Sequence, residues 1–321
     1  MKLTIGIPVY NGEKYISRCI DSILKEYEKA KENIELELLI VNDGSKDNSK
    51  TILKEYSDKL SFIKVVTQDN AGIAHVRKVI LEEASGDYLW FVDVDDEIDE
   101  GAIEFIANQK LEEVNIFDYR VGYDYSKLET ISMGIQENTI LIPNKEKKLF
   151  TLTNAVWHYI YDLEFLRRTK LTFKSGYLYE DFEFVAKLWP NVSRAIYFNF
   201  SIYKYYLTEG SIMRGGTPIN KIRDIEVMLN SVEAYYTENY PGEYKEELEY
   251  YNWYHMLYGG YANILRIDEK SPLLKDYLEK VNKKYPNWIK NKYLKIQPLK
   301  RKLLMYLIKY NQKSIVKKLL K

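Results

Sequence analysis

Over the first hundred residues, short apolar runs alternate with stretches that carry apolar side chains on one helical face. The runs at residues 3–7, 36–41, 62–66 and 88–92 have the length and the β-branched or aromatic composition of strands. The stretches at 15–28, 49–56 and 73–84 are predicted to be helices. Strands that alternate with helices predict an α/β fold, in which a mixed, mostly parallel central sheet carries helices on both faces.

Polar turns follow two of these predicted strands. Asp43 lies in an Asn-Asp-Gly-Ser turn after the run at 36–41, and the sequence Asp-Val-Asp-Asp at 93–96 follows the run at 88–92. In open α/β sheets, ligands bind beyond the carboxyl ends of the strands. We therefore expect both turns to lie at one edge of the sheet, where a ligand would bind.

The rest of the chain divides into a mixed segment and a helical one. Residues 107–215 contain strand-like runs at 115–123 and 195–206, whereas the sequence is helical in pattern from about Asn220 onwards. Pro241 and Pro272 mark boundaries between these helices. The sequence therefore predicts a sheet domain over residues 1–215 and a helical add-on domain with a basic tail over residues 216–321.

The composition is that of a folded globular protein, with 46% hydrophobic and 29% charged residues. The chain holds 47 basic and 47 acidic residues, but no acidic residue follows Glu279. The last 42 residues contain 14 lysines and arginines, which leaves 33 basic against 47 acidic groups in the rest of the chain. Such a split favours contact between the tail and an anionic surface.

The tail allows two interpretations. Leucines and isoleucines alternate with lysines between residues 300 and 320, a pattern typical of a terminal helix packed on the add-on domain. The same pattern is typical of a basic helix lying on an anionic membrane. No binding motif with interleaved aromatic residues accompanies the lysines, so we expect no nucleic-acid partner.

Three features bear on the compartment. Cys19 is the single cysteine and has no intrachain disulfide partner, and the apolar run at residues 3–7 is too short for a secretory leader. No stretch approaches the ~20 apolar residues of a transmembrane helix. We expect a cytoplasmic protein, peripheral at the inner face of the membrane if the tail binds lipid.

The acidic cluster at residues 93–96 is the sharpest chemical feature of the sequence. Neighbouring carboxylates raise one another's pKa, and a divalent cation relieves this repulsion. Mg²⁺ and Mn²⁺ suit a site of one or two carboxylates completed by ligand phosphates. A calcium loop would need glycine where Ile98 stands, and a haloacid-dehalogenase-like phosphatase usually carries its motif on the first strand. A loop of helix-capping acids is the alternative without a metal.

Two weaker motifs accompany the cluster. One joins the segment at residues 8–11 to the turn around Asp43, whose carboxylate at a strand end can accept a hydrogen bond from a base imide. An Asp-Gly turn by itself is more often only a turn. The other motif is the Asn-Ala-Gly-Ile-Ala-His-Val-Arg segment that ends at Arg77 and is followed by Gly-Asp-Tyr at 86–88.

In this order and at this spacing, the motifs resemble the family 2 glycosyltransferases of the GT-A fold over residues 1–215. The resemblance implies a UDP-sugar donor and a Mn²⁺ or Mg²⁺ cofactor. The residues that it assigns to the donor are Pro8, Val9, Tyr10, Asn11, Asp43, Arg77, Asp93 and Asp95. It assigns the metal to Asp95 and Asp96. The sequence departs from the family pattern at Asn42 and at residues 78–80.

The resemblance also assigns roles further along the chain. Asp181 matches the carboxylate that acts as general base, and Glu180 is expected to orient it or to contact the acceptor. Trp157 and His158 match a segment near the acceptor, with Trp157 as a stacking platform. The glycine-flanked loop at 210–216 matches a loop that closes over the donor phosphates, with Ser211 and Arg214 as phosphate contacts.

The resemblance therefore implies a metal-dependent, inverting transfer of a hexose from a UDP-sugar to a hydroxyl group of a glycan acceptor. Galactose and glucose are the favoured sugars and N-acetylhexosamines stay open, and the acceptor is either a lipid-linked polysaccharide unit or a protein-linked glycan. A non-catalytic sugar-binding or assembly partner and a metal-dependent phosphatase or nucleotidyltransferase stay open as alternatives. Neither the dinucleotide-binding Gly-x-Gly-x-x-Gly motif nor a P-loop motif occurs.

Overall fold

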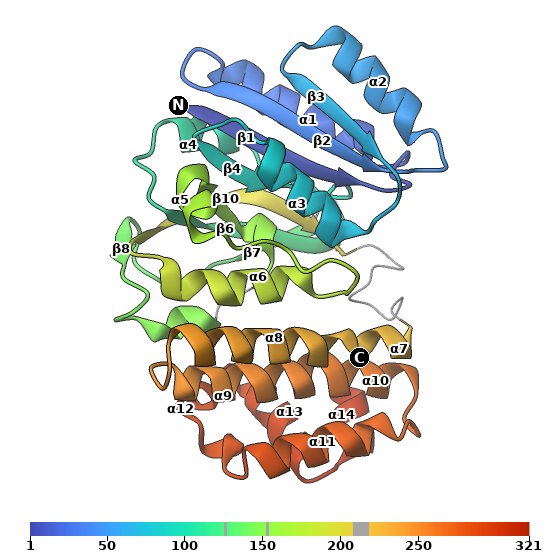
Figure 1. Ribbon diagram of the computed structural model, residues 1–321, viewed down its shortest axis with the longest axis vertical. Coiled ribbons are helices and arrows are strands. Elements are labelled where there is room, and N and C mark those ends of the chain that lie inside the picture. The colour runs from blue at the N-terminus through green and yellow to red at the C-terminus, as the bar shows by residue number, and fades with distance from the viewer. Residues whose placement is uncertain (125–126, 152–153, 208–217, 321) are drawn as a thin grey trace. The chain divides into compact units, whose positions relative to one another are not determined.

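The computed structural model describes residues 1–124, 127–151, 154–207 and 218–320 (Figure 1). The chain forms two compact units. The first comprises residues 1–146, 153–176 and 180–208, and the second comprises residues 147–152, 177–179 and 209–321. The sequence places a single boundary after residue 215, whereas here residues 147–152, 177–179 and 209–215 of the predicted sheet domain belong to the second unit.

The sheet of the first unit begins with four parallel strands in the order β3-β2-β1-β4. Their bounds are Lys2–Val9 for β1, Glu35–Asp43 for β2, Ile63–Gln68 for β3 and Tyr88–Phe91 for β4. Ile5 of β1 pairs with Leu38 of β2 on one side and with Trp90 of β4 on the other. This register brings the carboxyl ends of three strands to one edge and confirms the α/β fold class.

Beyond β4 the sheet becomes mixed. The short strand β9 (Tyr159–Asp162) runs antiparallel between β4 and β6 (Val114–Asp124), and β6 pairs in parallel with β10 (Ala195–Tyr206). The strands β5 (Glu97–Ile98) and β8 (Thr139–Leu141) pair with β10, and β7 (Lys127–Ile131) pairs with β6. The runs at 115–123 and 195–206 are strands as predicted. The sequence analysis did not predict β9, which is only four residues long.

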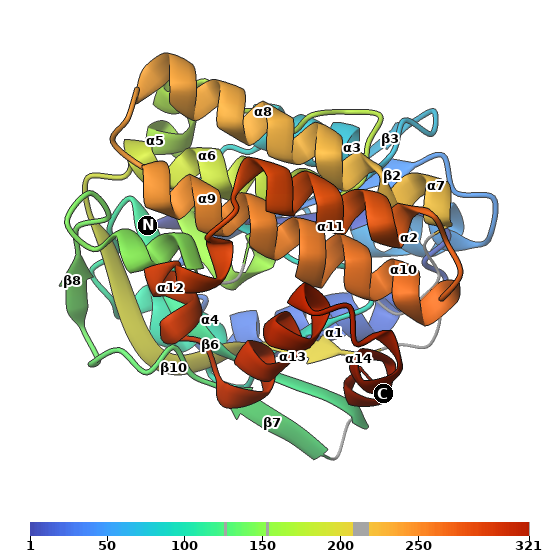
Figure 2. The same ribbon diagram turned by 90° about the horizontal axis from the view of Figure 1, so that it is seen from below.

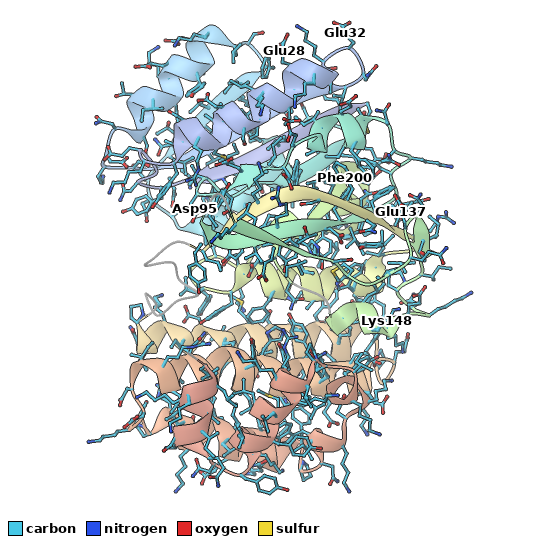
Figure 3. The ribbon with its side chains drawn as sticks, turned by 180° about the vertical axis from the view of Figure 1, so that it is seen from behind. Glu28, Glu32, Asp95, Glu137, Lys148 and Phe200 are labelled. Atoms are coloured by element: carbon cyan, nitrogen blue, oxygen red, sulfur yellow. The ribbon has the colours of Figure 1, made fainter. Side chains whose placement is uncertain are left out.

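Helices cover both faces of the parallel strands (Figures 1 and 3). Leu3, Ile5, Ile7 and Val9 of β1 share one buried cluster with residues of α1 (Ile16–Ala30), because alternate residues of a strand face the same side. On the other face, Gly6 leaves room for α3 (Ile73–Glu83). The remaining helices of this unit are α2 (Ser49–Lys59), α4 (Ala102–Ala107), α5 (Leu163–Thr169) and α6 (Glu180–Leu188).

The second unit is helical, as the sequence predicts. Its larger α-helices are α8 (Asp224–Asn239), α9 (Lys245–Tyr254), α10 (Ala262–Ile267), α11 (Leu273–Lys284), α13 (Leu299–Lys309) and α14 (Lys313–Leu319). A π-helical segment, His255–Tyr261, joins α9 to α10, and α11 packs against it (Figure 2). This contact is close, because a Cβ atom on Gly260 would lie 2.5 Å from the ring of Tyr277.

The shorter helical segments of this unit are η1 (Lys147–Thr151), α7 (Ile219–Ile222), η6 (Trp288–Lys290) and α12 (Lys292–Lys295). Among the helices that the structure describes, none combines the length and the apolar character that crossing a membrane requires.

Candidate active site

Three turns meet at the carboxyl edge of the parallel strands. Val9 pairs with Asn42 across β1 and β2, so the turn that begins at Tyr10 lies beside the turn around Asp43. The Asn11 amide donates to Ser45 Oγ over 2.9 Å, and Asn11 Oδ1 accepts from the amide of Lys46 over 2.8 Å. The third turn, residues 93–96, follows β4, which is the neighbour of β1 on its other side. The structure therefore holds these turns at the edge that the sequence predicts for ligand binding.

The Asp43 carboxylate organises the loop after β3. It is buried and accepts hydrogen bonds from the amides of Ala71 and Gly72, each over 2.8 Å, and from Gln68 Nε2 over 2.7 Å. Two carboxylate oxygens offer about four acceptor positions. The three bonds therefore leave room for one further donor, such as a base imide.

The segment at residues 8–11 offers a ligand one exposed aromatic ring. The Tyr10 side chain is 51% exposed, whereas Pro8 and Val9 are buried in the sheet. Val9 belongs to the cluster formed with α1. Pro8 and Val9 therefore offer a donor their backbone rather than their side chains, and their place in the donor site stays a prediction.

The acids of the 93–96 turn face different surroundings. Asp96 is fully buried, and one of its oxygens accepts from the Tyr203 hydroxyl over 2.7 Å while the other accepts from the Tyr206 amide over 2.8 Å. Burial, together with the charges of Asp95 and Asp93, raises its pKa well above the ordinary range. The expectation that Asp96 coordinates the metal stays a prediction, and in this structure both of its oxygens are engaged in the interior.

Asp95 is half-buried and lies beyond the strand ends (Figure 3). Its backbone carbonyl accepts a hydrogen bond from the guanidinium group of Arg18 on α1. Arg18 Nε also pairs with Glu97 over 3.0 Å, and its guanidinium group lies 4.9 Å from the centre of the Tyr206 ring. Arg18 therefore fixes the backbone of the turn.

Arg77 on α3 connects the acidic turn to the predicted catalytic segment. It is buried, it forms an ion pair with Glu180, and its Nη2 atom lies 3.1 Å from Asp93 Oδ1. Burial alone would lower the pKa of Arg77, but the charges of Glu180 and Asp93 raise it. The expected contact of Arg77 with the donor stays a prediction, and in this structure its guanidinium group is engaged by two protein carboxylates.

Glu180 and Asp181 form the first turn of α6, directly after Tyr179, which has a φ of 68°. Glu180 is buried beside Arg77, and Asp181 is half-buried and accepts from the Phe182 amide over 2.8 Å. Burial raises the pKa of both carboxyl groups, while the charge of Arg77 opposes this shift. Asp181 is therefore the more accessible member of the pair, and it is a stronger base than an ordinary aspartate.

Trp157 and His158 belong to the interior. Trp157 is 7% exposed and stacks on Tyr203, with the ring centres 4.5 Å apart. His158 Nε2 lies 2.7 Å from the carbonyl oxygen of Phe117, and burial lowers the pKa of His158 to about 4. The expectation that these two side chains contact the acceptor stays a prediction, and in this structure both are buried.

The sequence analysis missed the tyrosines at the end of β10. Tyr203 accepts from the Asp93 amide over 3.1 Å and donates to Asp96, so one hydroxyl holds two points of the acidic turn. The ring of Tyr205 is half-buried and lies 5.3 Å from that of Trp157. Burial and the nearby charges of Asp96 and Asp93 raise the pKa of Tyr205. The signal in the sequence was the tyrosine-rich run at 203–206, just before the predicted phosphate loop.

Ser211 and Arg214, the two expected phosphate contacts, lie outside the described residues. Their contacts with the donor phosphates therefore stay predictions.

The donor atoms suit a hard cation that shares its ligands with a phosphate. Among the residues that the structure describes, no three His, Cys, Asp or Glu side chains are grouped so as to hold a metal ion by themselves. Asp95 offers a half-buried carboxylate at the strand edge, and Asp93 lies two residues away with its carboxylate 26% exposed. Magnesium-type sites commonly combine one or two protein carboxylates with substrate phosphates and water.

Comparison with known proteins identifies the family of this chain. Residues 4–172 match the model of glycosyl transferase family 2. The glycosyltransferase GlyA of Streptococcus pneumoniae is 31% identical over 269 residues, which cover 77% of this chain and 37% of GlyA. The uncharacterized glycosyltransferase YibD of Escherichia coli is 28% identical over 66% of this chain and 63% of YibD. The alignments thus span less than two thirds of the length of these two relatives.

Solved structures share the fold. TarS 1–349 of Staphylococcus aureus, in complex with UDP-GlcNAc, matches all of this chain and 90% of that one, with a TM-score of 0.69 and 18% identity. The mannosyltransferase PcManGT of Pyrobaculum calidifontis, in complex with GDP-Man and Mn²⁺, matches 99% of this chain with a TM-score of 0.57 and 14% identity. At these identities the likeness concerns the GT-A-like fold alone.

Proposed function

The chain belongs to glycosyl transferase family 2, and on that premise we propose that it transfers a hexosyl group from a UDP-sugar to a hydroxyl group of a glycan acceptor, with inversion at the anomeric carbon. The observation that carries this proposal is the buried contact of Arg77 with both Asp93 and Glu180. Through it, the acidic turn after β4 and the first turn of α6 belong to one charged network. That network joins the residues proposed for the donor to those proposed for the acceptor.

The donor nucleotide is proposed to lie at the carboxyl edge of β1 and β2. The remaining acceptor position of Asp43 would take the imide N–H of uracil, and the exposed ring of Tyr10 would stack on the base. Asn11 would act indirectly, because its amide and side chain tie the two turns together. Recognition of UDP by a buried carboxylate would disfavour a base without the imide donor.

The diphosphate is proposed to share a Mn²⁺ or Mg²⁺ ion with Asp95. Asp93 would support this ion while Arg77 limits the negative charge of the turn. When bound, such an ion stabilises the charge that grows on the departing UDP. Asp96 would act on the metal only by positioning, because its hydrogen bonds with Tyr203 and the Tyr206 amide hold the turn in place.

Asp181 is the proposed general base. Its carboxylate would take the proton of the acceptor hydroxyl as that oxygen attacks the anomeric carbon, and the bond from this carbon to the UDP oxygen would break with its electron pair leaving on UDP. The raised pKa suits this task, because a base works best when its pKa approaches the working pH. Glu180 would orient Arg77 and the helix turn that presents Asp181.

The donor sugar is proposed to be glucose or galactose, and the acceptor to be a lipid-linked polysaccharide unit or a protein-linked glycan. N-acetylglucosamine is the competing donor sugar, because TarS of similar fold binds UDP-GlcNAc. A surface-glycan role is proposed on the family membership of the chain and on its similarity to the bacterial enzyme GlyA. The reaction is proposed to take place in the cytoplasm, at the inner face of the membrane.

The test is a panel of UDP-glucose, UDP-galactose and UDP-GlcNAc, scored by UDP release with MnCl₂ and with a chelator. We expect metal-dependent release of UDP from one of the three donors, with faster release when a glycan acceptor is added. The Asp181→Asn variant should bind UDP and release it from the sugar about 10²–10⁴-fold more slowly than the wild type. Equal activity of this variant would exclude Asp181 as the base. UDP release that an acceptor does not accelerate would favour a different reaction of the same carboxylates, and inactivity of the wild-type protein on every donor would favour a non-catalytic partner.

A further inference from the structure

The helix α13 in the second unit carries apolar side chains on two opposite faces. Leu304, Met305 and Ile308 are buried, and α13 packs against the π-helical segment and against α14. This part of the tail therefore follows the first of the two interpretations that the sequence allowed. Packing against the unit, however, uses only one side of the helix.

The opposite face exposes a second apolar row, here named the α13 stripe. Its members are Leu299, Leu303, Tyr306 and Tyr310, with exposed fractions of 79%, 47%, 45% and 67%. Spacings of four, three and four residues place them along one line of a helix with 3.6 residues per turn. A row of exposed leucines and tyrosines indicates an interaction surface. Exposed apolar residues that have no such role are normally scattered singly over the surface of a protein.

Positive charge flanks the stripe on both sides. Lys300 follows Leu299, and Lys302 precedes Leu303, so the helical twist places the two lysines on opposite sides of the row. Among the described residues, Lys300, Lys302 and Lys309 make no ion pair with an acid. No acidic residue occurs after Glu279 to offset them.

A cationic pocket adjoins the same helix. Its volume is about 300 Å³, and its walls include the basic residues Arg266, Lys300 and Arg301 and the apolar residues Leu304, Leu319 and Leu320. Arg301 also lies over the ring of Tyr258, with its guanidinium carbon 5.3 Å from the ring centre. A pocket with basic and apolar walls suits an amphiphile with an anionic head.

We propose that α13 docks this protein on an anionic lipid bilayer, with the α13 stripe at the level of the headgroups and the flanking lysines on the lipid phosphates. Leucines enter the acyl boundary, tyrosines suit the interface because they combine an apolar ring with a polar hydroxyl, and lysines reach the phosphates. Within the described part of the chain, Lys302 and Lys309 donate hydrogen bonds only to neutral oxygens, of Lys295 in one case and of Asn282 and Pro286 in the other. Charge complementarity selects this partner, because a protein interface does not call for an excess of cations without acidic partners around its apolar centre.

The test is binding of the full-length chain to vesicles of phosphatidylcholine with and without about 30 mol% phosphatidylglycerol, measured by co-sedimentation. We expect binding to the anionic vesicles, little binding to pure phosphatidylcholine, and loss of binding when the salt concentration is raised to about 0.5 M. The triple variant Leu299→Ser, Leu303→Ser, Tyr306→Ser should weaken the affinity for anionic vesicles by at least about tenfold.

A charge variant and its control complete the design. Lys300→Gln, Lys302→Gln, Lys309→Gln should also lose about tenfold or more in affinity. The control Lys50→Gln, Lys54→Gln, Lys59→Gln removes as many charges from α2 and should bind as the wild type does. If the triple serine variant unfolds at a lower temperature, the single variant Leu299→Ser replaces it, because that side chain has the highest exposure.

Three outcomes would overturn the proposal. They are absence of binding to the anionic vesicles, equal binding to both kinds of vesicle, and equal loss of binding in the α2 control. A change in oligomeric state of the stripe variant without vesicles, measured by light scattering, would instead identify the stripe as a contact between copies of the chain. These measurements involve no sugar donor, so their failure would leave the proposed reaction untouched.

Discussion

The guanidinium group of Arg77 contacts both Asp93 and Glu180, two carboxylates that lie 87 residues apart in the sequence. Asp93 begins the acidic turn after β4, and Glu180 begins α6. One buried cation therefore links the turn proposed to approach the donor diphosphate with the helix proposed to present the base. Removing this cation would leave the buried carboxylate of Glu180 without its cationic partner, which is costly in a protein interior.

Replacing Arg77 should destabilise the first unit strongly. We expect Arg77→Met to lower the free energy of unfolding by about 3–5 kcal/mol, because Glu180 stays buried without its cation. Chemical denaturation checks this value. The control is Lys78→Met, which removes an exposed charge from the same helix and should change the stability by less than about 0.5 kcal/mol. Similar losses in both variants would contradict the role assigned to Arg77.

Asp95 and Asp96 should respond differently to substitution. Asp95→Ala should abolish the metal-dependent part of UDP binding while the fold stays stable. Asp96→Ala should lower the stability by about 1–3 kcal/mol, because the Tyr203 hydroxyl and the Tyr206 amide lose their buried acceptor. Titration calorimetry with UDP and Mn²⁺, together with thermal unfolding, separates the two effects. The assignment fails if Asp96→Ala alone removes the metal dependence at unchanged stability.

Replacing Asp181 should separate binding from chemistry. Asp181→Asn should keep the affinity for UDP and lower the rate of transfer by about 10²–10⁴-fold, the usual contribution of a general base. The matched control is Asp47→Asn on the same edge of the sheet. The Asp47 carboxylate accepts hydrogen bonds from Ser49 and from the Glu13 amide. A loss of UDP affinity in Asp181→Asn equal to its loss of rate would argue against this division of roles.

The transfer rate should rise with pH as Asp181 loses its proton, and the rise should lie above the range of an ordinary aspartate. Burial raises the pKa of Asp181 in the folded protein, so the folded state binds this proton more tightly than the unfolded state does. The contribution of the protonated Asp181 side chain to stability is therefore present at low pH and is lost as the pH rises through the raised pKa. Rates of UDP release across a pH series test the predicted rise in activity, and denaturation midpoints across the same series test the predicted loss of stability. A flat rate profile would exclude Asp181 as the base.

Gly6 should tolerate no side chain while Ile80 keeps its size. A Cβ atom on Gly6 would lie 2.3 Å from Ile80 Cγ2, and both residues are buried between β1 and α3. We expect Gly6→Ala to lower the free energy of unfolding by about 1–3 kcal/mol, as overpacking of a core usually does. Adding Ile80→Ala to Gly6→Ala should cost less than the two single changes together, as measured by denaturant unfolding. Strict additivity would show that the two residues do not clash.

Several features could be predicted from residues close together in the chain. The alternation of strands and helices predicts the parallel sheet, and the order of strands and turns predicts that Asp43 and the 93–96 turn share an edge. Helical periodicity predicts the helical second unit. The motifs around Arg77 and Asp181 indicate family membership. These predictions succeed because local periodicity and turn chemistry depend on neighbouring residues.

The amino-acid sequence by itself thus determined the family and the sheet, and it predicted the edge at which a ligand would bind. Only the tertiary structure decided which side chains at that edge face inward. Asp95 and Asp96 are adjacent and chemically identical, yet Asp96 is buried because Tyr203 and Tyr206, more than a hundred residues away, supply its hydrogen bonds. Arg77 and Trp157 are likewise enclosed by partners from distant segments. The burial of a polar or aromatic group depends on which distant residues pack around it, and no spacing along the chain encodes that.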